Sequence, residues 1–414
     1  MTALLSFLRG RLWLWELSAL AWLLLLPYIM TAHGHLDWSG HALGRDFVNY
    51  WTAGHLVAEG HAPIIFDRDG FLTAEHRLFD PRLPFHFWSY PPVALFLVAP
   101  LGLLPYVPGL IVWSLFGLAV LIPAARSFLE NRREWVLLVA CPATAIDIAL
   151  GQNGAVTAAL LIGGLSLWDR RPTTAGAILG LLVFKPQLAI MLPVAVLAER
   201  RWKTMLAAGG VALGLLLLSV PVFGLEAWRV FFTSTLETQR LMLTQGKGPF
   251  QWMMPTVLMS GRLLGLPIVV AGTFQAIFAA GAVLAVWTGW RGAGDRDREA
   301  KVALLMAATF VASPQAFNYD LIPAACAALV VWRRDRTSWG HALSLLVWGL
   351  PILMIALQVV DGVGERGYLV KPLMVIAPLA LAGLTWRLWR LCMAEAPDSD
   401  SHFSSPKSPE RHRA

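Results

Sequence analysis

The sequence is poor in charge and in cysteine. Only 14% of its 414 residues are charged, and its three cysteines form no CxxC pair. We therefore expect neither disulfides nor a thiolate metal site. The chain also lacks a Walker loop, a GxSxG motif, an HExxH motif, and a GxGxxG motif between a strand and a helix. These absences argue against a nucleotide-driven pump and against the common hydrolases and metalloproteases.

Apolar runs rich in leucine and alanine fill most of the chain, and 57% of the residues are hydrophobic. The runs are continuous and do not alternate, which is typical of membrane-spanning helices and not of barrel strands. The formal net charge is +7, but the basic residues form short clusters between apolar runs. This positive-inside pattern accounts for the charge without a nucleic-acid partner. The sequence thus predicts an all-α polytopic membrane protein surrounded by membrane lipids.

Placing the basic clusters in the cytoplasm predicts about twelve membrane spans with both termini cytoplasmic. The spans are expected near 13–32, 106–125, 135–150, 154–168, 173–184, 186–198, 203–223, 266–289, 300–313, 316–333, 339–359 and 368–390. Residues 1–392 then form one domain in the plasma (inner) membrane. Residues 393–414, rich in Ser, Pro and charge, are expected to be a disordered cytoplasmic tail.

Several predicted spans are shorter than the roughly 20 residues that a straight crossing needs. The clearest cases meet at Lys185-Pro186 and at Ser313-Pro314. Such pairs predict helices that stop part-way across the membrane and line a cavity open to the outside.

Two long segments are expected outside the membrane. The first, 33–91, is rich in acidic residues and histidines and shows helical patterns near 47–59 and 69–79. We expect it to be a catalytic loop. The second, 224–264, contains apolar residues spaced along one helical face, which predicts a helix in the plane of the membrane interface.

Asp46 is the strongest candidate for a catalytic residue. It follows the first span and precedes an aromatic helix start at Phe47, Tyr50 and Trp51, which would hold that helix on the membrane surface. A carboxylate at this place can take a proton from a hydroxyl close to a hydrophobic entry route. The same position suits an N-cap of the helix that begins at Phe47, and the spacing favours the two roles equally.

Lys185 lies between two apolar runs, in Phe184-Lys185-Pro186-Gln187. A charge at membrane depth costs about 2.5–3.5 kcal/mol on insertion scales, so it normally has a partner. A phosphate group is the natural partner of an otherwise unpaired ammonium. The alternative is a lysine that snorkels to the outer surface from a short helical hairpin.

Two polar patches interrupt the apolar sequence further on. Gly151-Gln152-Asn153-Gly154 predicts a turn whose amides face the site, although a Gly/Asn turn is expected there on local grounds alone. The second patch is Ser313-Pro314-Gln315, followed by Asn318, Tyr319 and Asp320. Asp320 falls within a predicted span and therefore needs a partner as well.

Two clusters raise the question of a metal. The spacing of the histidines between residues 33 and 41 fits no helical ligand pair. Asp67 and Asp69 resemble the acidic pair with which nucleotide-sugar enzymes hold a divalent ion, but acids that flank an arginine in a loop are more often solvated. We expect no cofactor and no required metal, with Asp67 and Asp69 as a weak alternative.

A set of short motifs, taken in order, resembles glycosyltransferase family 87. The motifs are Asp46-Phe47 through Tyr50-Trp51, Gly60 with Ile65-Phe66, Tyr90-Pro91-Pro92 with Pro100, Gly151-Gln152-Asn153, Lys185-Pro186-Gln187 and Ser313-Pro314. None is specific alone; their order and spacing carry the resemblance, which runs from about residue 13 to 390. After Ser313-Pro314 the chain departs from the pattern, because members often carry Trp and His there. A histidine role is therefore not carried over.

The resemblance implies a GT-C fold and an inverting transfer of a hexose, often mannose, on the outer face of the membrane. The donor would be a polyprenyl-phosphate sugar and the acceptor a lipid or glycan. Asp46 would be the general base, Lys185 would contact the donor phosphate, and Gln152 and Asn153 would line the sugar pocket. Further candidates for donor or substrate binding are Arg45, Tyr50, Tyr90, Gln187, Gln315 and Asn318.

The chemistry of such a donor agrees with the residues present. The leaving phosphate needs a cation, and the acceptor hydroxyl needs a base on the opposite face of the sugar. The main alternative is a membrane transporter or flippase for a lipid or sugar, which also needs intramembrane charges. Such proteins usually show repeated halves with broken helices in matching positions, and the sequence shows no repeat. A non-catalytic membrane scaffold is a third alternative.

Overall fold

The computed structural model describes residues 12–29, 31–37, 40–84, 86–129, 131–293, 297–362 and 370–394. Helices make up most of these ranges, and the sheet found in them has two short antiparallel strands, β1 (Thr31–His33) and β2 (Leu36–Asp37). The predicted all-α class is therefore confirmed. Residues 395–414 of the predicted tail lie outside the described ranges.

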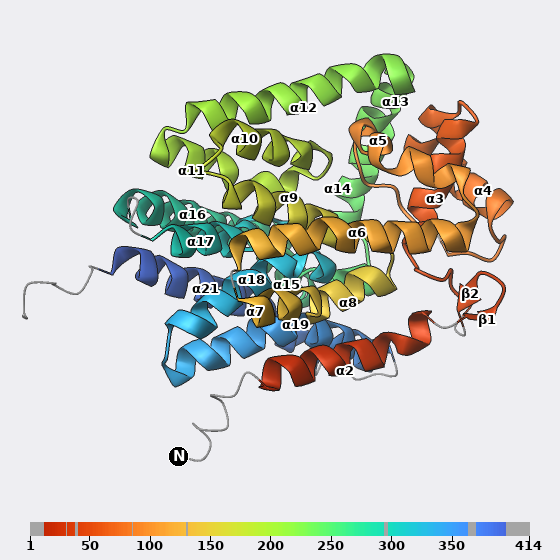
Figure 1. Ribbon diagram of the computed structural model, residues 1–414. Coiled ribbons are helices and arrows are strands. Elements are labelled where there is room, and N and C mark those ends of the chain that lie inside the picture. Colours follow the sequence, from red (N-terminus) through yellow and green to blue (C-terminus); the bar gives the residue numbers. More distant parts are fainter. Residues whose placement is uncertain are drawn as a thin grey trace, which may run out of the picture.

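Among the described residues, five helices are long and apolar enough to cross a membrane. They are α6 (Tyr106–Phe128), α12 (Trp202–Phe223), α16 (Ile268–Ala293), α19 (Ser338–Gly362), and α21 (Ile376–Met393) extended at its start by η9 (Lys371–Val375). In Figure 1, α12 runs along one side of the bundle and α2 (Leu12–Ile29) along the opposite side. Length and composition thus identify a membrane protein.

Shorter helices occupy the other predicted spans. They are α7 (Arg132–Val139), α8 (Pro142–Ala149), α9 (Gly154–Ser166), α10 (Pro172–Gly180) with η4 (Leu181–Phe184), η5 (Pro186–Ala189) with α11 (Leu192–Glu199), α17 (Arg298–Ala312), and η8 (Asn318–Leu321) with α18 (Ile322–Arg334). The predicted breaks at Lys185-Pro186 and Ser313-Pro314 are confirmed, since regular helix stops at both places. The number of membrane crossings stays a prediction.

The centre of the bundle is formed by α17, whose residues from Ala300 to Ala312 are all buried. A helix that is apolar around its whole circumference belongs inside a protein. Its neighbours include α16, α18 and α21, and together they form the largest hydrophobic cluster.

Ion pairs gather the predicted basic clusters at one end of the bundle. Asp169 pairs with both Arg201 and Arg298, and Lys301 lies 2.5 Å from Glu199. The pairs of Arg333 with Glu134, Arg334 with Asp297, and Arg387 with Asp335 tie the C-terminal helices into the same end. Within the described ranges, the basic residues of these ion pairs thus lie at the same end of the bundle.

The segment 33–91 folds against the other end of the bundle, at the right of Figure 1. It contains α3 (Phe47–Ala58), η1 (Ala62–Phe66) and α4 (Arg68–Leu78), and it is followed by η2 (Pro92–Ala94), α5 (Leu95–Val98) and η3 (Ala99–Leu103). These elements share a separate hydrophobic cluster with the start of α6. The predicted helices near 47–59 and 69–79 are confirmed.

The predicted helix in 224–264 is present as α13 (Leu225–Val230), a π-helical turn η6 (Phe231–Thr235) and α14 (Leu236–Thr244), followed by η7 (Pro249–Gln251) and α15 (Val257–Leu263). Ala227, Phe231 and Thr235, four residues apart, face the protein, and Thr235 donates to the Phe66 carbonyl oxygen at 2.9 Å. Leu225 and Phe232 are 71% and 60% exposed. The segment 224–264 therefore covers part of the segment 33–91.

Two glycines hold α3 against η3 at very short distance. A Cβ on Gly102 would lie 2.0 Å from the Gly54 carbonyl carbon, and one on Gly54 would lie 2.5 Å from the Gly102 nitrogen. Both clashes are with backbone, which cannot rotate away, so only glycine permits this contact.

We predict that Gly102→Ala lowers the free energy of unfolding by about 3 kcal/mol, the upper part of the usual range for overpacking. The thermal midpoint in detergent should fall accordingly. Gly214→Ala on α12 is the matched control, because nothing lies within 4 Å of its added methyl group. An unchanged midpoint for Gly102→Ala would show that the α3–η3 contact is not as tight as described.

Candidate active site

Asp46 lies at the start of α3, where the backbone is held by several long-range bonds. Its own N–H donates to the Leu150 carbonyl oxygen (3.1 Å), and Tyr106 Oη donates to the Leu43 carbonyl oxygen (2.6 Å). The preceding residue, Arg45, has a φ of 40°, which is rare for a residue other than glycine. Strain of this kind persists where the surrounding structure imposes it, and it is frequent at functional sites.

The side chain of Asp46 does not cap α3, so the N-cap alternative is wrong for the carboxylate. Its Oδ2 instead accepts a 2.8 Å hydrogen bond from Gln152 Nε2, more than a hundred residues away in sequence. Its Oδ1 makes no hydrogen bond within the described part of the chain, and the residue is half-buried. One carboxylate oxygen is thus held while the other stays open to a reaction partner.

Behind Asp46 lies a buried polar chain that joins most of the predicted site residues. Tyr50 Oη donates to Gln152 Oε1 (2.6 Å), and Asn153 Nδ2 donates to Tyr50 Oη (3.0 Å). Tyr90 Oη lies 3.0 Å from Tyr50 Oη. The structure therefore brings Asp46, Tyr50, Tyr90, Gln152 and Asn153 together, as a site requires.

The turn that carries Gln152 and Asn153 is clamped by two residues that the sequence analysis missed. Asp147 on α8 accepts hydrogen bonds from the Gly154 and Ala155 backbone N–H groups (2.5 and 3.0 Å) at the start of α9. Trp113 Nε1 donates to the carbonyl oxygens of Gly151 and Gln152 (3.0 and 2.9 Å). A carboxylate inside the predicted span 135–150 was the signal for Asp147, because such a charge needs partners.

Lys185 lies at the other end of the polar chain, and it is not unpaired. Its Nζ is 2.6 Å from Asp320 Oδ1 and donates to Asn153 Oδ1 at 2.9 Å. The side chains of Lys185 and Asp320 are 2% and 0% exposed, so the snorkelling alternative is wrong. The partner that each charge was expected to need is the other one, because burial of a lone ion is too costly.

Four other predicted residues are not links in the buried polar chain that runs from Asp46 to Lys185. Arg45 is half-buried and pairs with Asp37 at 2.9 Å. Asn318 is fully buried, and neither side-chain atom has a hydrogen-bond partner among the described residues. Gln187 and Gln315 are half-buried, and no side-chain hydrogen bond within the described ranges joins them to the chain. These two glutamines are therefore not linked by hydrogen bonds to the polar chain, and their role in binding stays a prediction.

The acidic pair of the metal alternative serves a local role at Asp67. This residue is the N-cap of α4, and its Oδ2 accepts the Gly70 N–H at 2.8 Å. Asp69 is exposed in the first turn of the same helix, where a negative charge is favourable. Within the described ranges, no three His, Cys, Asp or Glu side chains cluster as metal ligands.

A second carboxyl, Glu75 on α4, faces the Asp46 region from a fully buried position. Asn49 Nδ2 donates to Glu75 Oε1 (2.9 Å) and to the His86 carbonyl oxygen (3.3 Å). Burial raises the pKa of Glu75 to about 9; the backbone N–H of His86 opposes this shift, and the Asp46 charge adds to it. Burial also lowers the pKa of His86. At neutral pH Glu75 and His86 are therefore uncharged.

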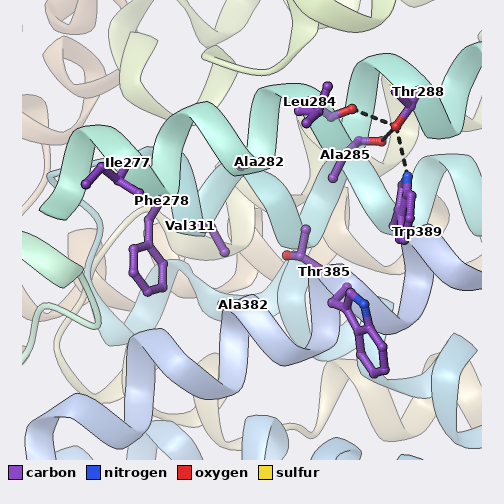
Figure 2. A pocket seen from close by; sticks show the side chains of 12 residues that line it. Ile277, Phe278, Ala282, Leu284, Ala285, Thr288, Val311, Ala382, Thr385 and Trp389 are labelled. Carbon is purple, nitrogen blue, oxygen red and sulfur yellow. Dashed lines mark hydrogen bonds between the residues drawn. The ribbon is translucent and has the colours of Figure 1, made fainter.

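A large apolar cavity elsewhere does not belong to this site. It measures about 500 Å³ and lies between α16, α17 and α21, as Figure 2 shows. Its two hydroxyl groups are used within the protein, since Thr288 and Thr385 donate to Leu284 and Leu381 carbonyl oxygens of their own helices. The lining contains no charged residue, so it offers neither a base nor a partner for phosphate.

The fold and the site define a helical membrane protein with a half-buried carboxylate backed by a buried polar chain. The model of glycosyltransferase family 87 matches residues 88–314, more than half of the chain, and the protein belongs to this family. It is therefore a glycosyltransferase, which moves a sugar from a donor to an acceptor. No curated protein and no solved structure matches the chain.

The matched range contains Tyr90, Gln152, Asn153 and Lys185, but it begins after Asp46 and ends before Asp320. The two carboxylates at the ends of the polar chain are therefore assigned by geometry and not by the family match.

The shifted pKa of Glu75 predicts how stability depends on pH. Between the usual value of 4.5 and about 9, the folded protein holds a proton that the unfolded chain releases. The free energy of unfolding should therefore fall as pH rises through this window. Thermal midpoints measured from pH 5 to 9 should show this slope, and Glu75→Gln, which stays neutral throughout, should flatten it. An equal slope in both proteins would contradict the assignment.

Proposed function

We propose that this glycosyltransferase moves a hexose, most simply mannose, from a polyprenyl-phosphate donor to a lipid or glycan acceptor. The transfer inverts the anomeric carbon, requires no metal, and takes place at the outer face of the plasma membrane on a GT-C-type scaffold. Asp46 is the general base.

The observation that carries this proposal is the environment of Asp46. The carboxylate is held through Oδ2 by Gln152 and leaves Oδ1 open at the end of the bundle opposite the ion-pair network. A base must reach the proton that it removes and must keep its orientation while doing so. A carboxylate serving only as a helix cap would have bonded to its own helix, which Asp46 does not.

The proposed reaction needs one base and one cation. Asp46 takes the proton of the acceptor hydroxyl, and the oxygen of that hydroxyl attacks the anomeric carbon of the sugar. The bond from that carbon to the phosphate oxygen breaks, and the electron pair leaves with polyprenyl phosphate. The products are the glycosylated acceptor, polyprenyl phosphate, and a protonated Asp46.

Arg45 is the cation that we assign to the leaving phosphate. It adjoins Asp46 in sequence, and its guanidinium is partly exposed. The sequence predicts Lys185 in this role, but the Lys185 side chain is only 2% exposed, whereas that of Arg45, although paired with Asp37, is 18% exposed. A guanidinium also suits phosphate oxygens, because it can donate two parallel hydrogen bonds.

The test is an assay of the purified protein in liposomes with labelled polyprenyl-phosphate hexoses and a lipid-extract acceptor. We predict that Asp46→Asn lowers kcat by about 10²–10⁴-fold, the usual contribution of a general base. Asp69→Asn is the matched control, since it removes an exposed carboxylate of the same external segment and should keep wild-type activity.

Two results would overturn the proposal. Full activity of Asp46→Asn would show that Asp46 is not the general base. Translocation of labelled lipid across the liposome membrane without any sugar transfer would identify a transport function, although the family match stands against that outcome.

A further inference from the structure

Every hydrogen bond in the buried polar chain points the same way. Lys185 Nζ donates to Asn153 Oδ1, Asn153 Nδ2 to Tyr50 Oη, Tyr50 Oη to Gln152 Oε1, and Gln152 Nε2 to Asp46 Oδ2, at 2.9, 3.0, 2.6 and 2.8 Å. The chain therefore begins at a cation and ends at the carboxylate proposed as the base.

Chemistry fixes this direction. An ammonium group can only donate and a carboxylate can only accept. Between them, each amide accepts on its oxygen and donates from its nitrogen. Tyr50 has a single proton, which goes to Gln152, so Tyr90 must be the donor in the 3.0 Å contact between the two hydroxyls. Reversing any one link would leave two donors or two acceptors facing each other.

Aligned hydrogen bonds polarise one another, and the effect is stronger where water is excluded. The residues between the two ends, Tyr50, Gln152 and Asn153, are all buried. The positive charge of Lys185 therefore polarises the Gln152 amide N–H that donates to Asp46. Asp320 keeps that charge in place, since its Oδ2 is itself anchored by the Phe317 N–H at 3.1 Å.

Lys185 is poorly placed to bind a donor directly. Two of its three N–H groups are used by Asn153 and Asp320. Its ammonium also lies 6.0 and 5.1 Å from the ring centroids of Tyr90 and Tyr319, and its side chain is 2% exposed. Nor does stability account for the pair, because buried ion pairs contribute little net free energy to folding.

We propose that Lys185 and Asp320 are positioning residues: they orient and polarise the chain through Asn153, Tyr50 and Gln152 that holds Oδ2 of Asp46 and leaves Oδ1 to take the acceptor proton. This role rests on the proposed function, because it requires Asp46 to act as the base.

The test removes both charges together, as Lys185→Met with Asp320→Asn, so that neither is left buried alone. We predict that kcat falls about 10- to 100-fold, as for the loss of one hydrogen bond to a charged group. The KM for the donor should stay within about twofold. The acidic limb of the rate–pH profile should move to higher pH, because the anion of Asp46 is less stabilised.

Other titratable groups that interact with Asp46 are unchanged in this variant. They are Tyr50 on the same helix, Glu75 on α4, His86, Tyr106 on α6 and Tyr319 on η8, with Arg45 adjacent in sequence. A movement of the acidic limb therefore reports the loss of the Lys185–Asp320 ion pair.

A second variant covers the case in which the double variant does not fold. Tyr50→Phe removes the hydroxyl in the middle of the chain and keeps the ring. It should lower kcat and move the acidic limb in the same direction. Thr309→Val on α17 is the control, since it deletes an equally buried hydroxyl that bonds to the Leu305 carbonyl oxygen of its own helix and not to the polar chain.

The outcomes separate the two proposals. Full activity of Asp46→Asn would end the proposed function and this inference with it. If Asp46→Asn is inactive while the charge-free variant keeps wild-type kcat and pH profile, only the positioning role is wrong. A raised donor KM with an unmoved acidic limb would instead place Lys185 on the donor phosphate and overturn the inference.

Discussion

The ion pair between Lys185 and Asp320 is the constraint on which the arrangement of the site depends. Each residue lies where regular helix is interrupted, Lys185 between η4 and η5 and Asp320 on η8. Neither charge is tolerable alone in a buried, apolar setting, because desolvation would cost several kcal/mol. The two interruptions must therefore meet. Their meeting point adjoins the start of α9, where Asn153 completes the contact.

Irregular backbone at membrane depth is acceptable only when its polar groups are satisfied inside the protein. Here Asp147 and Trp113 bond to the turn 151–155, and Asp320 bonds to the Phe317 N–H. The groups that satisfy the broken helices are thus also those that orient the site. Structure and proposed catalysis use the same polar residues, which is economical in a protein with few charges.

The segment 33–91 brings Asp46, the proposed base, to this buried framework. Its contact with η3 depends on Gly54 and Gly102, and its covering by α13 and α14 depends on the Phe231 and Thr235 face. These contacts place Asp46 at the border between the polar chain and the surroundings of the bundle. A donor that is itself a membrane lipid would meet a base at such a border without leaving the membrane. The sugar and the acceptor hydroxyl would then react outside the hydrocarbon region.

Local physics was enough to predict much of the fold from the sequence. Apolar runs, proline breaks and basic clusters depend on neighbouring residues, and they correctly indicated the membrane helices, the interruptions at Lys185 and Ser313, and the helices α3 and α4. The same is true of isolated polar positions, because a carboxylate or amide in apolar sequence is conspicuous by itself. For this reason Asp46, Gln152, Asn153 and Lys185 could be named in advance and are found in one connected chain.

Which polar side chains pair with one another could not be predicted, because pairing depends on packing between elements far apart in the chain. Lys185 and Asp320 are separated by 135 residues, and both Asp46 alternatives had equal local support until Gln152 was found beside the carboxylate. The sequence around Glu75 is typical of a solvated acid on a surface helix. Only burial in the tertiary structure raises the pKa of Glu75 so that the residue is neutral. The sequence by itself determined which segments are helical and which residues are costly to bury. The tertiary structure alone decided which of those residues meet, since the cost of a buried charge is relieved only by the particular group that packing places against it.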